Sequence, residues 1–454
     1  MIFPIAFIVA LGVLIIVHEY GHYRVAVACG VKVDRFSVGF GRVIWRRQPT
    51  PGGTEFVISA LPLGGYVRWI DDQEGGVPAA EECYTFRSKS LPRRAAIVAA
   101  GPVANLLLAV LLYAMVNWIG IDEPKALLGA PAVGSLAERA GVRAGDWARA
   151  SSTDDHEWRE LRSMVDLNWE LTQAVLRGER LRLQLTDSKG RGEHGVVLPL
   201  DTLAGKEIDA KLLRSVGIGA PYVEPVVQRV VPDGPAARAG LRAGDRVLSI
   251  DAQPIADSSR VVELVRTSAD KGDPPAMTWR VERSGQVFDL QITPRVEVLD
   301  GKRFGRTAIE FARPQVVLVR YGVFEGLQQA ARRTWEMSTL TVKIFGRMLI
   351  GQASLKNISG PLTIAEYAGE SARLGPAFFL GFLAVLSVSL GVLNLMPVPV
   401  LDGGYLMYYL FEAVTGRPVS QEWLSRLQRG GLAIVVLLMS LALYNDVARH
   451  LGLQ

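Results

Sequence analysis

Hydrophobic residues are concentrated in a few long uncharged runs near the two ends of the chain, whereas the middle has the mixed pattern of a water-soluble protein. A helix needs about 20 mostly apolar residues to cross the hydrocarbon core of a bilayer, so these runs predict transmembrane helices. The last run is shorter than the others and spans only if the residues before it join the helix. The candidate segments are Met1 to about Val27, Ala95 to Ile121, Leu374 to Leu401, and Gly430 to Tyr444 with Leu424 to Arg429 added.

Basic residues predict the orientation of these spans. They are frequent between the first and second runs, and Arg417, Arg426 and Arg429 lie between the third and fourth. Cytoplasmic loops carry an excess of Lys and Arg, so both loops are expected in the cytoplasm. The segment from about Glu123 to Arg373 and both termini are then expected outside. No Lys or Arg precedes Arg24, so we expect no cleaved signal peptide.

The outer segment contains a tandem repeat. Arg139-Ala-Gly-Val-Arg-Ala-Gly-Asp146 returns as Arg238-Ala-Gly-Leu-Arg-Ala-Gly-Asp245, which predicts two units of about 100 residues. In each, a short helix and a glycine turn precede a strand, and Arg246–Ile250 alternates as a strand should. The stretch after Asp146 is poor strand sequence. The pattern resembles bacterial PDZ domains, which bind peptides by strand addition; the alternative is that both copies are only spacers or size filters.

An amphipathic stretch follows the repeats. Its apolar residues share one helical face, with charged residues on another, which is typical of a helix lying in the membrane interface. A surface helix on the soluble insert is the alternative. The apolar face consists of Phe324, Leu327, Ala331, Trp335, Val342, Phe345 and Leu349.

Composition excludes several classes of protein. The net charge of +5 is modest, and no basic stripe is interleaved with aromatic residues, so no nucleic-acid binding is expected. The two cysteines, Cys29 and Cys83, lack metal-ligand spacing and do not form a disulfide framework.

His18-Glu19-Tyr20-Gly21-His22 predicts a metal site in the first span. Residues four apart lie on one helical face, so His18 and His22 can bind one Zn²⁺ together. Glu19 is then placed to act as general base on a water bound to the metal. Inserting a charged carboxylate into a membrane costs roughly 2.5–3.5 kcal/mol, so these groups need a compensating role, and metal binding supplies one.

A third ligand is expected from the end of the third run. Pro397 and Pro399 cannot continue a helix, so the backbone must open in Asn394-Leu-Met-Pro-Val-Pro-Val-Leu-Asp-Gly-Gly404. Open backbone at membrane depth is tolerated only against protein or a wet cavity. Asp402 can therefore face the metal; the alternative is a helix N-cap at the cytoplasmic interface.

Together, His18-Glu19-x-x-His22 and Asn394-x-x-Pro397-x-Pro399-x-Leu401-Asp402-Gly403 resemble the site-2 protease family, over nearly the whole chain. The resemblance implies a polytopic α-helical membrane protein with four transmembrane helices, a membrane re-entrant β-hairpin and two inserted PDZ-like α+β domains. It implies one Zn²⁺ held by His18, His22 and Asp402, with Glu19 as the general base. It also implies substrate contacts by Asn394, Pro397 and Pro399, and by the hairpin residues Gly64 and Gly65. Tyr405 stands where relatives often carry His, which leaves a supporting role there open.

The expected divisions follow from these features. They are 1–29 (first span), 30–94 (hairpin region), 95–121 (second span), 122–221 and 222–314 (PDZ-like domains), 315–373 (amphipathic helix and linker), 374–416 (third span) and 417–454 (loop and fourth span).

By resemblance, the function is hydrolysis of peptide bonds within single-span membrane proteins that were already trimmed outside the membrane. An anti-sigma factor of envelope-stress signalling and remnant signal peptides are the expected substrates. The expected location is the bacterial inner membrane, with the repeats in the periplasm and the active site near the cytoplasmic side. Extracytoplasmic peptides are expected as further partners of the repeats.

Two alternatives remain. A non-catalytic membrane adaptor would bind extracytoplasmic peptides through the PDZ-like pair, would hold no metal and would not depend on Glu19. A transporter would carry broken helices in two similar halves, whereas only the third run is interrupted here.

Overall fold

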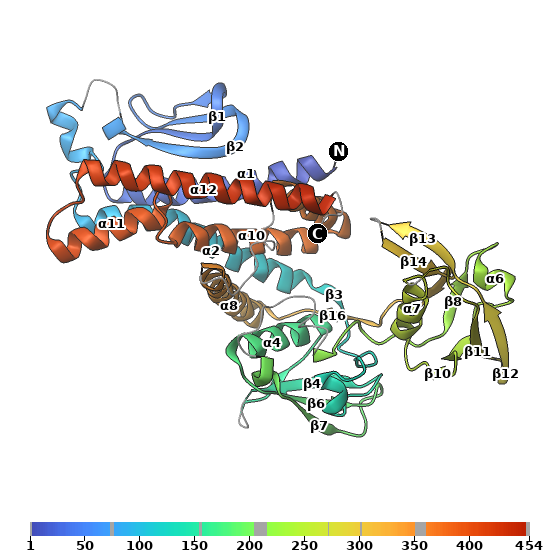
Figure 1. Ribbon diagram of the computed structural model, residues 1–454. Coiled ribbons are helices and arrows are strands. Elements are labelled where there is room, and N and C mark those ends of the chain that lie inside the picture. The colour runs from blue at the N-terminus through green and yellow to red at the C-terminus, as the bar shows by residue number, and fades with distance from the viewer. Residues whose placement is uncertain are drawn as a thin grey trace. The chain divides into compact units, whose positions relative to one another are not determined.

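The computed structural model describes residues 2–72, 77–153, 157–203, 216–270, 272–299, 302–349 and 360–450. The chain forms two compact units, of which one comprises Met1–Ile121 with Arg320–Gln454 and the other Asp122–Val319. The first unit is called the membrane unit below and the second the repeat unit (Figure 1).

Long helices dominate the membrane unit. They are α1 (Ile2–Ala28), α2 (Leu91–Ile119), α8 (Val323–Leu349), α9 (Pro361–Leu374), α10 (Pro376–Leu395), α11 (Asp402–Thr415) and α12 (Gln421–His450). Within the described residues, α1, α2, α10 and α12 are long and apolar enough to cross a membrane, which confirms the four predicted spans. Small residues allow α1 and α2 to approach closely: a Cβ on Gly21 would meet Ala100 and Ala104.

The third predicted span differs from a single helix over 374–416. α10 ends at Leu395, because the prolines that follow cannot donate to the helix, and a new helix begins at Asp402. Val400, at the end of the open stretch, has a φ of 89°. The helix α9, which precedes α10, was not predicted.

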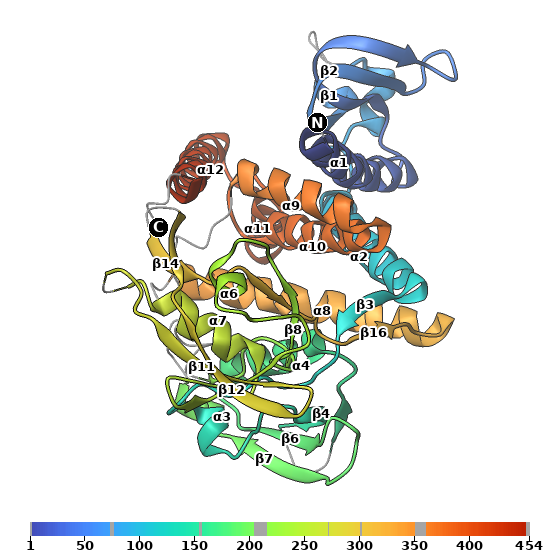
Figure 2. The ribbon, with the colours of Figure 1, turned by 90° about the vertical axis from the view of Figure 1, so that its right-hand side faces the viewer.

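A long hairpin packs against α1, as Figures 1 and 2 both show. Its strands are β1 (Val33–Arg47) and β2 (Glu55–Trp69), and they pair antiparallel with Val38 opposite Gly65. Two short 3-10 helices, η1 (Ile70–Asp72) and η2 (Ala79–Tyr84), lead from the hairpin toward α2. Exposed apolar residues, including Ile44 and Leu61, lie on this hairpin.

α8 packs on α2 through small residues. Gly326, Ala330 and Thr334 are buried, and the Asn117 side chain of α2 donates to the Gly326 carbonyl at 2.8 Å. The predicted apolar face lies elsewhere on the helix and is mostly exposed, with Phe324 88% and Trp335 71% exposed. Phe345 is half-buried, and the Leu349 side chain lies outside the described residues. An interfacial position for this helix stays a prediction.

The repeat unit contains two copies of one arrangement. The first has α3 (Leu136–Arg139), β4 (Trp147–Ser152), β5 (Arg159–Glu160), α4 (Met164–Arg177), β6 (Leu181–Thr186), β7 (His194–Leu198) and η3 (Leu200–Leu203). The second has β8 (Val227–Val230), α6 (Pro235–Arg238), β9 (Arg246–Ile250), β10 (Gln253–Pro254), α7 (Ser258–Thr267), β11 (Met277–Arg283), β12 (Gln286–Ile292), β13 (Arg295–Leu299), β14 (Lys302–Arg306) and β15 (Ile309–Phe311). β3 (Ile121–Pro124) and β16 (Val316–Val319) pair with each other.

The two sheets have the same strand order, β5-β4-β6-β7 and β10-β9-β11-β12. The residues after Asp146 were expected to be a poor strand, and this expectation is wrong. Trp147–Ser152 forms β4 in the interior of its sheet. Pairing with β5 and β6 and burial of Ala148 and Ala150 outweigh the weak intrinsic preference of Ala and Ser for strands.

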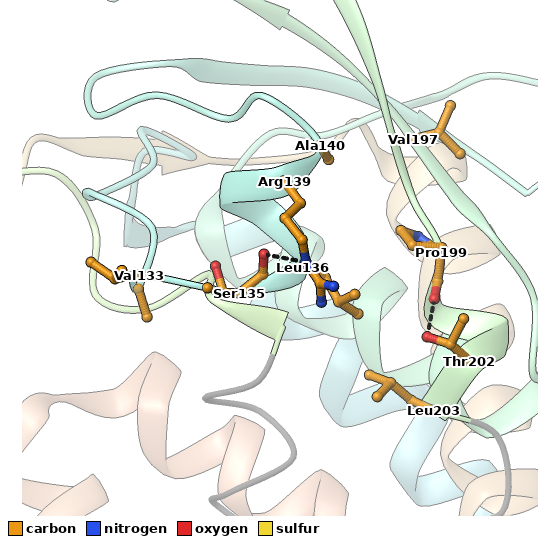
Figure 3. A pocket seen from close by; sticks show the side chains of 11 residues that line it. Val133, Ser135, Leu136, Arg139, Ala140, Val197, Pro199, Thr202 and Leu203 are labelled. Atoms are coloured by element: carbon orange, nitrogen blue, oxygen red, sulfur yellow. Dashed lines mark hydrogen bonds between the residues drawn. The ribbon is translucent and has the colours of Figure 1, made fainter.

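Each repeat has its own apolar core. Leu167, Leu181, Leu183 and Leu185 are fully buried in the first, and Trp279 is fully buried in the second. The first repeat also has a surface cavity of about 650 Å³ beside α3 (Figure 3). Val197 of β7 and Thr202 of η3 line its far side, and the Thr202 hydroxyl donates to the Pro199 carbonyl.

Candidate metal centre

α1 holds His18 and His22 one turn apart on one face. Their Nε2 atoms lie 3.2 Å from each other, and the imidazole side chains are 12% exposed. His22 Nδ1 lies 2.8 Å from the Ile97 carbonyl oxygen of α2. A carbonyl can only accept, so Nδ1 carries the proton and Nε2 presents its lone pair to His18.

Asp402 reaches this pair from the start of α11. Its Oδ2 lies 3.2 Å from His18 Nε2 and 3.5 Å from His22 Nε2. The open backbone between α10 and α11 makes the approach possible. Gly403 and Gly404 allow α11 to begin this close to the preceding loop, because a Cβ at either position would collide with the loop carbonyls.

The three donor atoms fit a tetrahedral zinc ion. Ligand atoms about 2.0–2.1 Å from a tetrahedral Zn²⁺ lie about 3.4 Å from one another. The observed separations are 3.2, 3.2 and 3.5 Å. His18, His22 and Asp402 are also the one group of His, Cys, Asp and Glu side chains among the described residues with this closeness. Two imidazoles and a carboxylate leave one tetrahedral position open, as catalytic zinc sites require.

The arrangement is suited to a cation. Apart from the two imidazole nitrogens, the buried Asp402 Oδ2 has no polar partner among the described residues. It faces the lone pair of His22 Nε2 across 3.5 Å, and acceptor atoms repel one another at such distances unless a positive charge lies between them. A structural N-cap role for Asp402 does not explain this, because Leu401 occupies the N-cap position.

Glu19 lies beside the β2 strand. A Cβ at Gly65 would be 3.1 Å from Glu19 Cγ and 2.9 Å from the Ser37 carbonyl oxygen. Only glycine lets the strand backbone pass this close to α1 at Glu19. The preceding Gly64 has a φ of 118°, which disfavours residues with a Cβ. The structure thus brings the predicted hairpin residue Gly65 next to the predicted general base, whereas Gly64 lies against the Phe40 ring.

The remaining predicted contacts lie around the open backbone. Asn394 is in the last turn of α10, half-buried, and its side chain makes no hydrogen bond among the described residues. Pro397 is exposed and Pro399 half-buried, with Gly431 of α12 packed against Pro399. The Tyr405 hydroxyl accepts a hydrogen bond from Gln428 of α12 at 3.1 Å rather than contacting the metal ligands.

Two partners of the metal ligands were missed from the sequence. The Ile97 carbonyl is a backbone group and has no sequence signal. Asn105 of α2 is fully buried, and its amide lies 3.2 Å from His18 Nδ1. An amide within an otherwise apolar span was the available signal, since buried polar groups in membrane helices mark functional sites.

Comparison with known proteins agrees with this geometry. The sequence profile of Peptidase family M50 matches residues 6–438. A putative zinc metalloprotease of Ralstonia nicotianae is 39% identical over 99% of both chains. The regulator of sigma-E protease RseP of Escherichia coli is 38% identical over 98% of both chains. A solved HtrA-type protease, AlgW with a decapeptide, covers 30% of this chain and 50% of its own at 21% identity, with a TM-score of 0.14. With its histidine pair and aspartate in place, this multi-pass chain belongs to Peptidase family M50 and is an intramembrane zinc metalloprotease of the RseP-like site-2 type.

Proposed function

We propose that this protease cleaves the transmembrane segments of single-span membrane proteins, using one Zn²⁺ held by His18, His22 and Asp402 and Glu19 as the general base. The observation that carries the proposal is the separation of 3.2–3.5 Å among the three donor atoms, which come from two distant parts of the chain. The full-length likeness to RseP supports membrane proteins as the substrates.

Zinc, His22 and Glu19 would have different roles in the reaction. Zinc, when bound, would lower the pKa of a water molecule toward 7 and polarise the scissile carbonyl. His22 is fixed by the Ile97 carbonyl, so its Nε2 needs no reorientation to serve as ligand. Glu19 would accept the proton of the attacking water and pass it to the leaving amide nitrogen.

The hairpin would bind the substrate backbone. A transmembrane helix hides its carbonyls in its own hydrogen bonds, so it must unwind before cleavage. β1 and β2 form a two-stranded sheet among the described residues, which leaves strand edges that an extended substrate can join. Because Gly65 lies beside Glu19, a substrate on this sheet would run next to the catalytic carboxylate. Asn394, Pro397 and Pro399 would contact it from the other flank.

The substrate class follows from the relatives and the repeats. RseP is named a regulator of sigma-E, so an anti-sigma factor trimmed outside the membrane is the leading substrate, with remnant signal peptides as a second type. The repeats would lie in the periplasm and exclude untrimmed proteins. The second repeat would also bind extended peptides, with the active site toward the cytoplasmic side of the inner membrane.

Glu19→Gln tests this function directly. Full-length protein purified in detergent would be given a single-span substrate with a reporter on each side of its membrane segment. The variant should keep zinc near one per chain and lose at least about 100-fold in cleavage rate. Glu370→Gln, an exposed change in the same unit, is the matched control and should cut normally. Wild-type protein that holds no zinc and cuts no faster than Glu19→Gln would favour the adaptor function instead.

A further inference from the structure

Asn105 is the most completely buried polar side chain that contacts a metal-ligand candidate. It lies in α2 with no exposed surface, and its Nδ2 is 3.2 Å from His18 Nδ1. Its own Oδ1 is buried without a hydrogen-bond partner among the described residues. The Ser387 hydroxyl of α10 donates to the Asn105 carbonyl at 2.7 Å, which fixes the backbone at this point.

The orientation of the amide can be decided from the metal site. His18 can offer a lone pair from Nε2 toward His22 and Asp402 only when its proton is on Nδ1. A protonated Nδ1 donates, so its partner must be an oxygen, not the amide nitrogen. The oxygen and nitrogen of an Asn amide are assigned from their hydrogen bonds, and either orientation here leaves one amide atom unpaired. The tautomer of His18 therefore decides that the amide oxygen of Asn105, and not the nitrogen, faces Nδ1.

We propose that Asn105 is a positioning residue whose amide oxygen accepts the Nδ1 proton of His18 and thereby holds Nε2 free for the metal. Turning the amide by 180° places Oδ1 where Nδ2 now stands, 3.2 Å from Nδ1. His18 and His22 then have matching arrangements: each ring donates from Nδ1 to an oxygen of α2, one a side-chain amide and the other the Ile97 carbonyl. The helix α2 would orient both ligands without touching the ion.

The proposal rests on the ligand set of the proposed function. It goes beyond it by assigning a role to a residue outside the two sequence motifs. Groups that hold a ligating imidazole typically contribute 10–100-fold to metal affinity. Loss of the amide should therefore weaken zinc binding while leaving the three ligands present.

The test is zinc affinity of full-length detergent-purified protein, measured with Zn²⁺ alone against a competing chelator. Asn105→Leu keeps the branched heavy-atom skeleton but removes the acceptor, and should bind zinc 10–100-fold more weakly, still at one per chain when saturated. Asn105→Asp restores an acceptor and should bind close to wild type. Ser387→Ala is the control that removes only the contact to the Asn105 backbone.

The outcomes separate the two proposals. Wild-type affinity in Asn105→Leu, or equal weakening in Asn105→Asp and Asn105→Leu, would overturn the role of Asn105 alone. Wild-type affinity in His18→Ala would instead overturn the ligand set, and the role of Asn105 with it. Asn105→Asp also covers the case in which the leucine variant misfolds, because the carboxylate preserves shape and acceptor; its failure to bind zinc would contradict the proposal.

Discussion

Two aspartates with buried carboxylate oxygens, one in each unit, differ in how well those oxygens are paired. In the second repeat, Asp245 has no exposed surface, yet Arg283 donates to both of its oxygens at 2.6 Å, and the Arg242 amide donates to Oδ2 at 2.8 Å. In the membrane unit, Asp402 has an Oδ2 that receives no hydrogen bond among the described residues and faces two imidazoles.

The difference separates structure from function. A buried carboxylate with paired oxygens fixes a turn and a strand, so its replacement should act on stability. A buried carboxylate that faces other acceptors is unfavourable until a cation arrives, so its replacement should act on metal binding. Four predictions test this distinction, in order of decreasing effect.

Asp402→Asn should have the largest effect. The amide keeps the size of the side chain but removes the charge that pairs with zinc, so zinc content should fall well below one per chain. Cleavage should fall by about 10³-fold or more, because the ligands act as one unit. Elemental analysis and the single-span cleavage assay measure the two effects. Hydrogen-exchange protection of β9 and β11 should be unchanged, and full zinc occupancy in this variant would contradict the assignment.

Asp245→Asn should lower the stability of the second repeat and leave zinc binding unchanged. Asp245 is buried but Arg283 is 27% exposed, so the loss of the charged hydrogen bonds should cost about 2 kcal/mol of local stability. Hydrogen exchange of β9 and β11 in the full-length protein would measure the loss. Zinc content should stay at the wild-type level, and the Asp402→Asn protein is the matched comparison. Unchanged protection of both strands would show that the pair is not structural.

Acid should weaken the second repeat through the same carboxylate. Burial opposes ionisation of Asp245, but the hydrogen bonds from Arg283 outweigh it and hold the pKa of Asp245 below its usual range. Its stabilisation is complete above the unfolded-state pKa of about 3.9 and is lost as pH falls through the folded-state pKa. Protection of β9 and β11, corrected for intrinsic rates, should therefore stay constant down to about pH 5 and then drop as the pH falls through about 4 and below.

Asp245→Asn serves as the control for this pH dependence. Exposed carboxylates of the same repeat, Asp289 and Glu310, also have lowered pKa values because of their arginine partners, and they are present in both proteins. The drop should be smaller in Asp245→Asn by the share that Asp245 contributes. Equal drops in the two proteins would remove Asp245 as the cause.

Asp146→Asn should have the smallest effect. Asp146 occupies the equivalent turn of the first repeat and accepts from the Arg143 amide at 2.8 Å. The ion-pair candidate of Asp146 is a histidine and not an arginine: His194 Nε2 lies 3.5 Å from Asp146 Oδ2. This nitrogen makes no hydrogen bond among the described residues. The substituted amide still has an oxygen for Arg143, so we expect a loss of about 1 kcal/mol or less in protection of β4 and β6. A loss as large as that for Asp245→Asn would erase the distinction between the repeats.

Much of the fold could be predicted because its signals are local. Long apolar runs predict spanning helices, and the repeated Arg-Ala-Gly motif predicts a repeated unit, in keeping with two sheets that share one strand order. The strand β4 could not be predicted, because Ala and Ser enter a strand here only through pairing with β5 and β6. The break between α10 and α11 was expected from Pro397 and Pro399. The end of α10 at Leu395 and the separate helix α9 were not expected.

The sequence by itself determined one half of the metal site, because the helical period places His18 and His22 on one face whatever surrounds them. It also indicated Asp402, through the prolines that open the backbone before it. Only the tertiary structure decided that Asp402 Oδ2 comes within 3.5 Å of both imidazoles, and that Ile97 and Asn105 of α2 lie behind them. These contacts join residues that are distant in the chain, and they depend on the close packing of α1 against α2 that Gly21 and its alanine neighbours allow.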